Sequence, residues 1–182
     1  MSGQTVLEKG ETAPDFELRN FNGESVALSD LDNFDGVLVI FMCNHCPYVQ
    51  AEVEEIRRLD DRFSSIAIVG INPNSETHPM DSYEKMGEFV DEKGLESSNF
   101  YYLEDPDQEV AERFGAECTP DPFLLDWRHR LYYHGKLDDS KPGTEEDAEN
   151  FFMEEAIQKM LKRQEPPEQG DKPVGCSIKW KE

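Results

Sequence analysis

Two cysteines three positions apart are the residues of this chain whose types and spacing most clearly point to chemistry. Cys43 and Cys46 lie in the stretch FMCNHCPYVQ, with His45 just before the second cysteine and Pro47 just after it. Such a pair can form a reversible disulfide, supply half of a metal site, or include one peroxide-reacting thiol. Because the thiolate is the nucleophile, the outcome depends on the elements that position the two sulfurs.

The residues around the pair predict a strand that leads into a helix. GVLVIFM (36–42) is continuously apolar, as in a strand buried on both faces of a sheet. From Cys46 to Phe63 the apolar residues recur at helical spacing. Cys43 is therefore expected within a residue or two of the helix, whose dipole stabilises a thiolate. Cys46 would lie one turn along, and Pro47 would fall in the first turn, where its missing N–H costs nothing.

The rest of the chain has the pattern of further strands and helices. The predicted strands are FELRN (16–20) and SVALS (25–29) as an entry hairpin, SIAIVGI (65–71), NFYYLED (99–105), and PFLLD (122–126) with RLYYHGK (130–136) as an antiparallel pair. Helices are predicted from Asp81 to Lys93, from an N-cap at Asp105 to Phe114, and from Thr144, Glu145, Glu146 and Asp147 to Arg163. This order predicts an α/β sandwich with a mixed central β-sheet flanked by helices.

The C-terminal tail is set apart from this pattern. Residues 1–164 are expected to form one domain, because the chain is long enough for a single core. Residues 165–182 begin as a proline-rich linker and end in VGCSIKWKE, which is too short to fold alone. Its Cys176, Ile178 and Trp180 suggest a segment laid back across the domain.

These motifs together resemble the thioredoxin-like superfamily, and more closely its redoxin branch, the AhpC/TSA-like proteins related to peroxiredoxins. GETAPDFEL (10–18) is similar to the entry motif of that branch, CNHCPYV to its redox helix, and ECTPDPFLLD (117–126) to the strand that opens with a threonine and a cis-proline. The whole pattern, with NPN, MDSYEKM, GKLDD and GCSIKW, is similar to a group of redoxin-domain proteins. The resemblance implies a thioredoxin-like sandwich with an N-terminal β-hairpin extension.

The resemblance also implies a thiol–disulfide oxidoreductase. Cys43 would be the exposed attacking thiol and Cys46 the resolving one, with Thr119 and a cis Pro120 packed opposite them. No bound cofactor or metal is expected, because the cysteine pair itself holds the electrons. The implied partners are a disulfide-bearing protein or small molecule, and a reductant such as a thioredoxin or a thioredoxin-reductase-type system.

Several residues near the pair modify this expectation. Asn44, His45 and Pro47 are expected to support the couple, and a polar group at His45 favours the reduced, thiolate form. Met42 stands where thioredoxins proper have a tryptophan, so a generic set of thioredoxin partners is not expected.

A thiol peroxidase with antioxidant activity is the first alternative. Peroxiredoxins carry Pro-x-x-x-Thr-x-x-Cys, in which the reactive cysteine corresponds to Cys46. Here Cys43 replaces the threonine and Val39 replaces the proline. The second alternative is a copper- or zinc-binding protein that uses Cys43, Cys46 and His134, because two thiolates and an imidazole suit Cu(I) or Zn(II).

Two further cysteines remain open to more than one interpretation. Cys118 could face the pair as a third thiol or metal ligand, or could be a small buried hydrophobe. Cys176 could be a distant resolving thiol or an inert cysteine in a docked segment.

The charge of the chain excludes some classes of partner. Forty acidic and eighteen basic residues give a formal net charge of -22, which disfavours nucleic acid and anionic membrane surfaces. The longest apolar run is too short to span a membrane, and the start has no signal-peptide pattern. A soluble cytoplasmic protein is therefore expected. The dispersed acidic residues also predict a halophilic source, because salt screens their repulsion.

Overall fold

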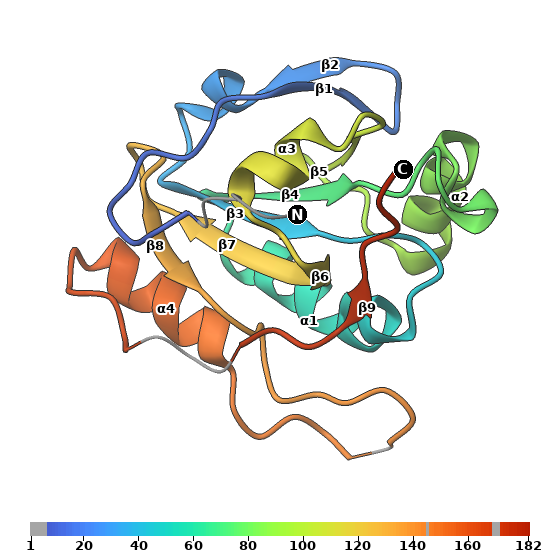
Figure 1. Ribbon diagram of the computed structural model, residues 1–182. Helices are drawn as coiled ribbons and strands as arrows, with labels where there is room; N and C mark the ends of the chain where they lie inside the picture. The colour runs from blue at the N-terminus through green and yellow to red at the C-terminus, as the bar shows by residue number, and fades with distance from the viewer. Residues whose placement is uncertain (1–6, 145, 169–171) are drawn as a thin grey trace.

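A computed structural model describes residues 7–144, 146–168 and 172–182 and contains a seven-stranded mixed sheet (Figure 1). The strands lie in the order β2-β1-β5-β4-β3-β7-β8. They are β1 (Glu17–Asn20), β2 (Ser25–Ala27), β3 (Gly36–Phe41), β4 (Ile66–Asn72), β5 (Phe100–Glu104), β7 (Asp121–Leu125) and β8 (Leu131–His134). Strand β3 pairs in parallel with β4 and antiparallel with β7, and the β1–β2 hairpin joins the sheet at β5. The predicted α/β sandwich with a mixed sheet and an N-terminal hairpin is confirmed.

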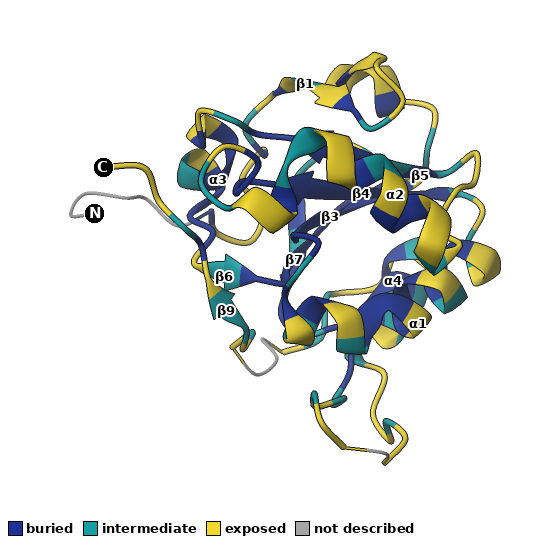
Figure 2. Cartoon of the chain, turned by 90° about the vertical axis from the view of Figure 1, so that its right-hand side faces the viewer, coloured by how far each residue is buried: buried dark blue, intermediate teal, exposed yellow. Residues whose placement is uncertain are grey.

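Helices cover both faces of this sheet. One face carries α1 (Pro47–Arg62), α2 (Tyr83–Lys93) and α4 (Phe152–Leu161), and the other carries α3 (Glu109–Phe114) and the 3-10 helix η1 (Leu28–Leu31). Successive side chains of a strand point to opposite faces, so β3 contributes to both cores. Every residue of β3 is therefore buried, as its apolar run predicts (Figure 2). Within the described residues, no helix is long and apolar enough to cross a membrane.

The helix after β3 follows the predicted pattern closely. Its buried face includes Val49, Val53, Ile56 and Leu59, and Pro47 occupies its first position, where no amide is needed. Helix α2 also ends as predicted, because Gly94 adopts a left-handed conformation (φ 64°) that stops it.

Helix α3 begins later than the sequence predicts. It starts at Glu109, because Gln108 has a left-handed φ of 65° that interrupts the expected first turn. The carboxylate of Asp105 still accepts hydrogen bonds from the amides of Val110 and Ala111, at 3.3 and 2.8 Å. Asp105 therefore caps the helix without being its N-cap residue.

Helix α4 also begins later than predicted, at Phe152. The carboxylate of Asp139 accepts hydrogen bonds from the amides of Glu149 and Asn150, at 2.9 and 3.3 Å, and keeps them outside the helix. Thr144 and the described residues up to 151 are not helical, whereas Glu145 lies outside the described residues.

The C-terminal tail lies back across the domain, as predicted. Strand β9 (Cys176–Ser177) pairs antiparallel with β6 (Cys118–Thr119), and Figures 1 and 2 show the two side by side. Ile178 is buried in the core on the α3 side of the sheet. The division into a domain of residues 1–164 and a tail of residues 165–182 stays a prediction.

Candidate active site

Cys46 occupies the N-cap position of α1, so the helix begins at Pro47, farther from Cys43 than the predicted one or two residues. The cause is Asp81, whose Oδ1 accepts hydrogen bonds from the amides of Asn44 and His45, at 2.8 and 3.0 Å. These two residues are thereby held in a turn between β3 and α1. The dipole of the helix consequently acts most directly on Cys46.

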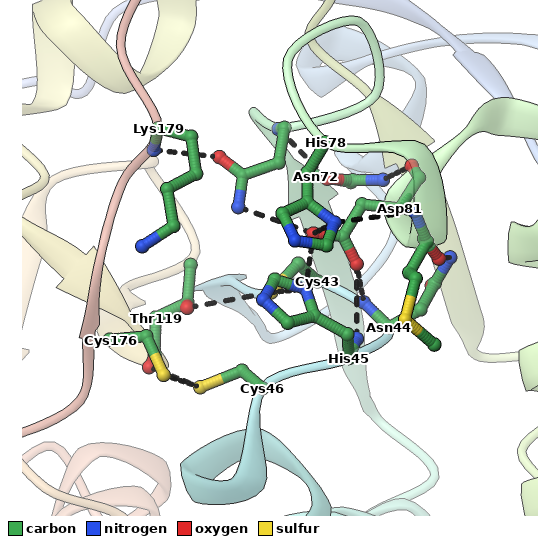
Figure 3. A network of polar contacts seen from close by, with 12 residues as sticks. Cys43, Asn44, His45, Cys46, Asn72, His78, Asp81, Thr119, Cys176 and Lys179 are labelled. Carbon is green, nitrogen blue, oxygen red and sulfur yellow. Dashed lines mark hydrogen bonds and ion pairs between the residues drawn. The ribbon is translucent and has the colours of Figure 1, made fainter.

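Asp81 is the buried centre of a polar network (Figure 3). Its Oδ2 lies 2.6 Å from Nδ1 of His45, and the ring of His45 stacks on His78 with 3.9 Å between ring centroids. The side chain of Asn44 accepts a hydrogen bond of 2.8 Å from the hydroxyl of Tyr102. The segment between the two cysteines is therefore fixed through both its backbone and its side chains.

The sequence patterns did not identify this carboxylate. Asp81 was expected as the first residue of a helix, but it lies in the 3-10 helix η2 (Pro79–Asp81), and α2 begins two residues later. No local pattern distinguishes a buried acceptor from one of the many surface acids of this chain.

Both thiols of the pair are fully buried, each with an exposed fraction of 0%. The Sγ of Cys43 lies 3.6 Å from the hydroxyl oxygen of Thr119 and 3.8 Å from Nδ1 of His45. The Sγ of Cys46 lies 3.3 Å from the carbonyl oxygen of Thr119 and 2.7 Å from the Sγ of Cys176. The expectation that Cys43 is an exposed thiol is wrong, because Thr119 and the surrounding core enclose it.

The pKa values of the two thiols are shifted in opposite directions. The hydrogen bond between the thiols is the largest cause: it raises the pKa of Cys43 and lowers the pKa of Cys46. Burial and the nearby Asp81 carboxylate raise the pKa of Cys43 further. Hydrogen bonds from Cys176 and from the amide of Val49 also lower the pKa of Cys46, against the effect of its burial. Negative charge is therefore favoured on Cys46, with Cys43 as the protonated partner.

Thr119 contacts both thiols, and its peptide bond to Pro120 is cis, as the resemblance implied. Cys118 points elsewhere, because neighbouring residues of a strand face opposite sides. Its Sγ lies 3.6 Å from the carbonyl oxygen of Pro120 and 3.8 Å from that of Pro173, and burial raises its pKa to about 12. These contacts are those of a partly buried thiol beside the pair, not of a third thiol facing it.

A metal ion could be held by a different set of residues from the predicted one. Among the described side chains, the metal-ligating atoms of Cys43, His45 and Asp81 all lie within 4.8 Å of one another. His134 instead pairs with a carboxylate of β7 and stacks on a phenylalanine of the same strand. The predicted ligand set of Cys43, Cys46 and His134 is therefore wrong, because the imidazole of His134 contacts residues of β7 instead of the two thiols.

A cavity of about 360 Å³ adjoins the cis-proline. Its lining includes Tyr48, Glu52, Pro120, Lys136, Pro173 and Val174. Burial, followed by the nearby Asp138, raises the pKa of Glu52 to about 10, so this carboxyl group is neutral at pH 7. The site thus combines a buried thiol pair with an adjacent cavity whose charged lining residues include Lys136, Lys141 and Asp138.

The fold and the site together define a thioredoxin-like protein with a cysteine pair at the end of a central strand. A model of the AhpC/TSA family matches residues 9–134, and the chain belongs to this family. The predicted membership of the redoxin branch is confirmed, whereas a halophilic source stays a prediction.

Curated relatives include both classes of redox protein considered above. The chain is 32% identical over 111 residues to "Peroxiredoxin Bcp" of Bacillus subtilis (strain 168), a match that covers 60% of this chain and 64% of the relative. It thus spans slightly less than two thirds of that relative's length. The chain is also 26% identical over 153 residues to "Thiol-disulfide oxidoreductase ResA" of Halalkalibacterium halodurans, covering 82% of this chain and 78% of the relative.

Two solved structures resemble almost the whole chain. An uncharacterized conserved protein from Geobacillus kaustophilus has a TM-score of 0.89 and 35% identity, covering 97% of this chain and 94% of that chain. A hypothetical protein from Sinorhizobium meliloti 1021 has a TM-score of 0.89 and 33% identity, covering 97% of both chains. The likeness therefore extends beyond the family match and includes the C-terminal tail.

Proposed function

We propose that the protein is a thiol–disulfide oxidoreductase in which Cys43 and Cys46 alternate between a dithiol and a disulfide. The observation that carries this proposal is the position of the two sulfurs: both are buried beside the start of α1, and both contact Thr119, at 3.6 Å from its hydroxyl oxygen and 3.3 Å from its carbonyl oxygen. An oxidoreductase is also what the family and its curated relatives support.

Within this function, Cys46 is the attacking thiol and Cys43 resolves, the reverse of the roles implied by the resemblance. Cys46 has the N-cap position, and the neighbouring thiol of Cys43 stabilises its thiolate. Its thiolate attacks one sulfur of a substrate disulfide and releases the other sulfur as a thiolate. Cys43 then loses its proton, attacks Cys46 and releases the second substrate thiolate. The substrate gains two electrons and the protein is left with one disulfide.

The cavity beside Pro120 is the docking place that we assign to the substrate chain. It adjoins Thr119, the residue that contacts both thiols, and has room for a side chain. A disulfide-bearing protein or small molecule remains the proposed substrate class. A thioredoxin-type reductant in a reducing cytoplasm would restore the dithiol.

A thiol peroxidase is the second candidate function, and the position of Cys46 favours it. A thiolate at a helix N-terminus can attack a peroxide oxygen, which gives a sulfenic acid on Cys46 and releases an alcohol or water. The thiol of Cys43 would condense with this sulfenic acid to form the disulfide and a water molecule. The relative named "Peroxiredoxin Bcp" supports the same candidate.

A redox titration with differential alkylation and peptide mass mapping tests the proposed couple. We expect a reversible Cys43–Cys46 disulfide with a midpoint between about −270 and −120 mV, the range of the thioredoxin-like oxidoreductases. Absence of this pair at every potential would overturn the proposed function.

Single substitutions test the order of attack. With an aromatic disulfide as substrate, the double variant Cys43→Ser/Cys176→Ser should release one thiolate and trap a mixed disulfide on Cys46, because it lacks both thiols that could resolve it, whereas Cys46→Ser should not react. Trapping on Cys43 in the Cys46→Ser variant would restore the order implied by the resemblance. Peroxide consumption measured with the same variants decides between the two candidate functions.

A further inference from the structure

Cys176 of the C-terminal tail reaches the sulfur of Cys46 directly. The two Sγ atoms are 2.7 Å apart although the residues are 130 positions apart in the chain (Figure 3). This distance between the sulfurs is shorter than a hydrogen bond between two thiols needs. The two sulfurs are therefore close enough for disulfide exchange. Neither the proposed couple nor its resolving step uses this third thiol.

The position of Cys176 is set by strand pairing. In the β6–β9 ladder Cys176 lies directly opposite Thr119, the residue that contacts both Cys43 and Cys46. The ladder is unusually close, because a Cβ atom on Gly175 would clash with the carbonyl group of Thr119. A glycine is therefore required for the tail to bring the next residue onto the thiol pair.

Contacts beyond β9 hold the tail in this register. The amide of Lys179 donates to Oδ1 of Asn74 at 3.0 Å, and its carbonyl oxygen accepts from Nε2 of Gln108 at 2.8 Å. The amide of Lys181 donates to Oε1 of Gln108 at 2.8 Å, and Ile178, which precedes both lysines, is buried. The tail is thus docked by several elements, and the contact between the sulfurs is one part of a larger interface.

Exposure separates Cys176 from the other two thiols. Cys43 and Cys46 have no exposed surface, whereas Cys176 is partly exposed. While β9 is docked, Cys176 is more accessible to a large redox partner than the buried pair is. Burial, followed by the contact with Cys46, raises the pKa of Cys176 to about 11, so Cys176 is held as a thiol rather than as a competing thiolate.

We propose that Cys176 is a third redox cysteine. It replaces Cys43 as the disulfide partner of Cys46, and in this way it relays electrons between external partners and the buried pair. This proposal rests on the proposed function, since it needs an oxidised Cys43–Cys46 couple.

The relay conserves electrons at each step. In the oxidised protein, Cys176 loses its proton and attacks Cys46, so that the Cys43–Cys46 bond breaks, a Cys46–Cys176 bond forms, and Cys43 takes up the proton. This exchange changes no oxidation state. An external dithiol then attacks Cys176 and expels Cys46, which is a good leaving group because its pKa is low. The second external thiol resolves the mixed disulfide, so the external pair is oxidised and all three cysteines of the protein are reduced.

Disulfide mapping of the full chain after oxidation with diamide tests the relay. The variants are Cys43→Ser, Cys176→Ser and, as a matched control, Cys118→Ser, whose sulfur does not contact the pair. We expect Cys43→Ser to form an intramolecular Cys46–Cys176 disulfide whose yield does not change on dilution. The wild type and Cys118→Ser should contain a mixture of molecules with the Cys43–Cys46 disulfide and molecules with the Cys46–Cys176 disulfide. Cys176→Ser should contain only the Cys43–Cys46 disulfide.

A rate measurement separates a relay from a merely structural tail. Reduction of the oxidised protein by a thioredoxin-type dithiol protein should be severalfold slower in Cys176→Ser than in the wild type or Cys118→Ser. Equal rates, or a Cys43→Ser variant that leaves Cys46 unpaired, would overturn the relay. Loss of the Cys43–Cys46 disulfide in Cys176→Ser would instead count against the proposed function, so the two failures are distinguishable.

Discussion

Two buried carboxyl groups near the thiols are stabilised in different ways. Asp81 accepts hydrogen bonds from the amides of Asn44 and His45 and from the His45 ring, which compensate its burial. The Oε2 atom of Glu52 has no hydrogen-bond partner among the described residues, and Asp138 is close by. Asp81 organises the active-site turn, whereas the surroundings of Glu52 disfavour a negative charge on its carboxyl group.

The raised pKa of Glu52 predicts how the free energy of unfolding depends on pH. The pKa of Glu52 is about 10 in the folded protein, against about 4.3 in an unfolded chain. The folded state therefore holds one more proton in this interval, and the free energy of unfolding should fall as pH rises through it. Glu52→Gln should remove this fall and stabilise the protein at pH 8 by roughly 1–3 kcal/mol.

Urea unfolding at pH 5, 7 and 9 checks this prediction. Glu54→Gln is the matched control, because Glu54 lies on the same helix with its side chain exposed. Its unfolding midpoint should follow the wild type at each pH. A Glu52→Gln variant with the same pH dependence as the wild type would contradict the assignment.

The elements that frame the site differ in what determines them. Strand β3 and helix α1 follow from local apolar patterns, and both were predicted close to their observed ends. The starts of α3 and α4 were predicted too early. In α3 the left-handed φ of Gln108 interrupts the expected first turn, and before α4 the carboxylate of Asp139 binds the amides of Glu149 and Asn150 outside the helix. Strand β9 has only two residues, and its position depends on β6 rather than on its own propensity.

The close approach of β9 to β6 predicts a specific effect of Gly175→Ala. The added methyl group would clash with the backbone of Thr119, so the tail should be displaced and the protein destabilised by roughly 1–3 kcal/mol. Displacement should also uncover Cys46 and increase its rate of alkylation. Kinetics with iodoacetamide and peptide mapping measure this rate.

Val174→Ala is the control for this variant, because Val174 is the neighbouring tail residue and is 56% exposed. Cys46 of this variant should be alkylated at the wild-type rate. If Gly175→Ala also does so, the docked tail does not limit access to Cys46.

The whole molecule carries a formal net charge of -22, and this charge is dispersed over the chain. At low salt the like charges repel one another and oppose the compact state. We therefore expect the melting temperature to rise between dilute buffer and molar KCl, by about 2–4 °C for each kcal/mol of repulsion that is screened.

Scanning calorimetry in a KCl series measures this effect. NaCl at equal ionic strength is the control, because screening depends on ionic strength and not on the identity of the cation. A melting temperature that does not change with salt would argue against the predicted halophilic source.

Local residue patterns were enough to predict the alternation of strands and helices, the family resemblance and the residues of the CxxC pair. These features are encoded in patterns of neighbouring residues, which local propensity and periodicity make visible. The sequence could also name Cys176 as a candidate thiol, but it could not decide between a reactive and an inert cysteine.

Long-range packing fixes which cysteine caps α1, which carboxylate holds the turn, and where Cys176 lies. Asp81 is 37 positions from Asn44, and Cys176 is 130 positions from Cys46. Contacts at such separations arise from the packing of the sheet and the docking of the tail, for which no local pattern exists. Burial and hydrogen bonding then shift the reactivity of the two thiols in opposite directions, because they depend on these distant neighbours.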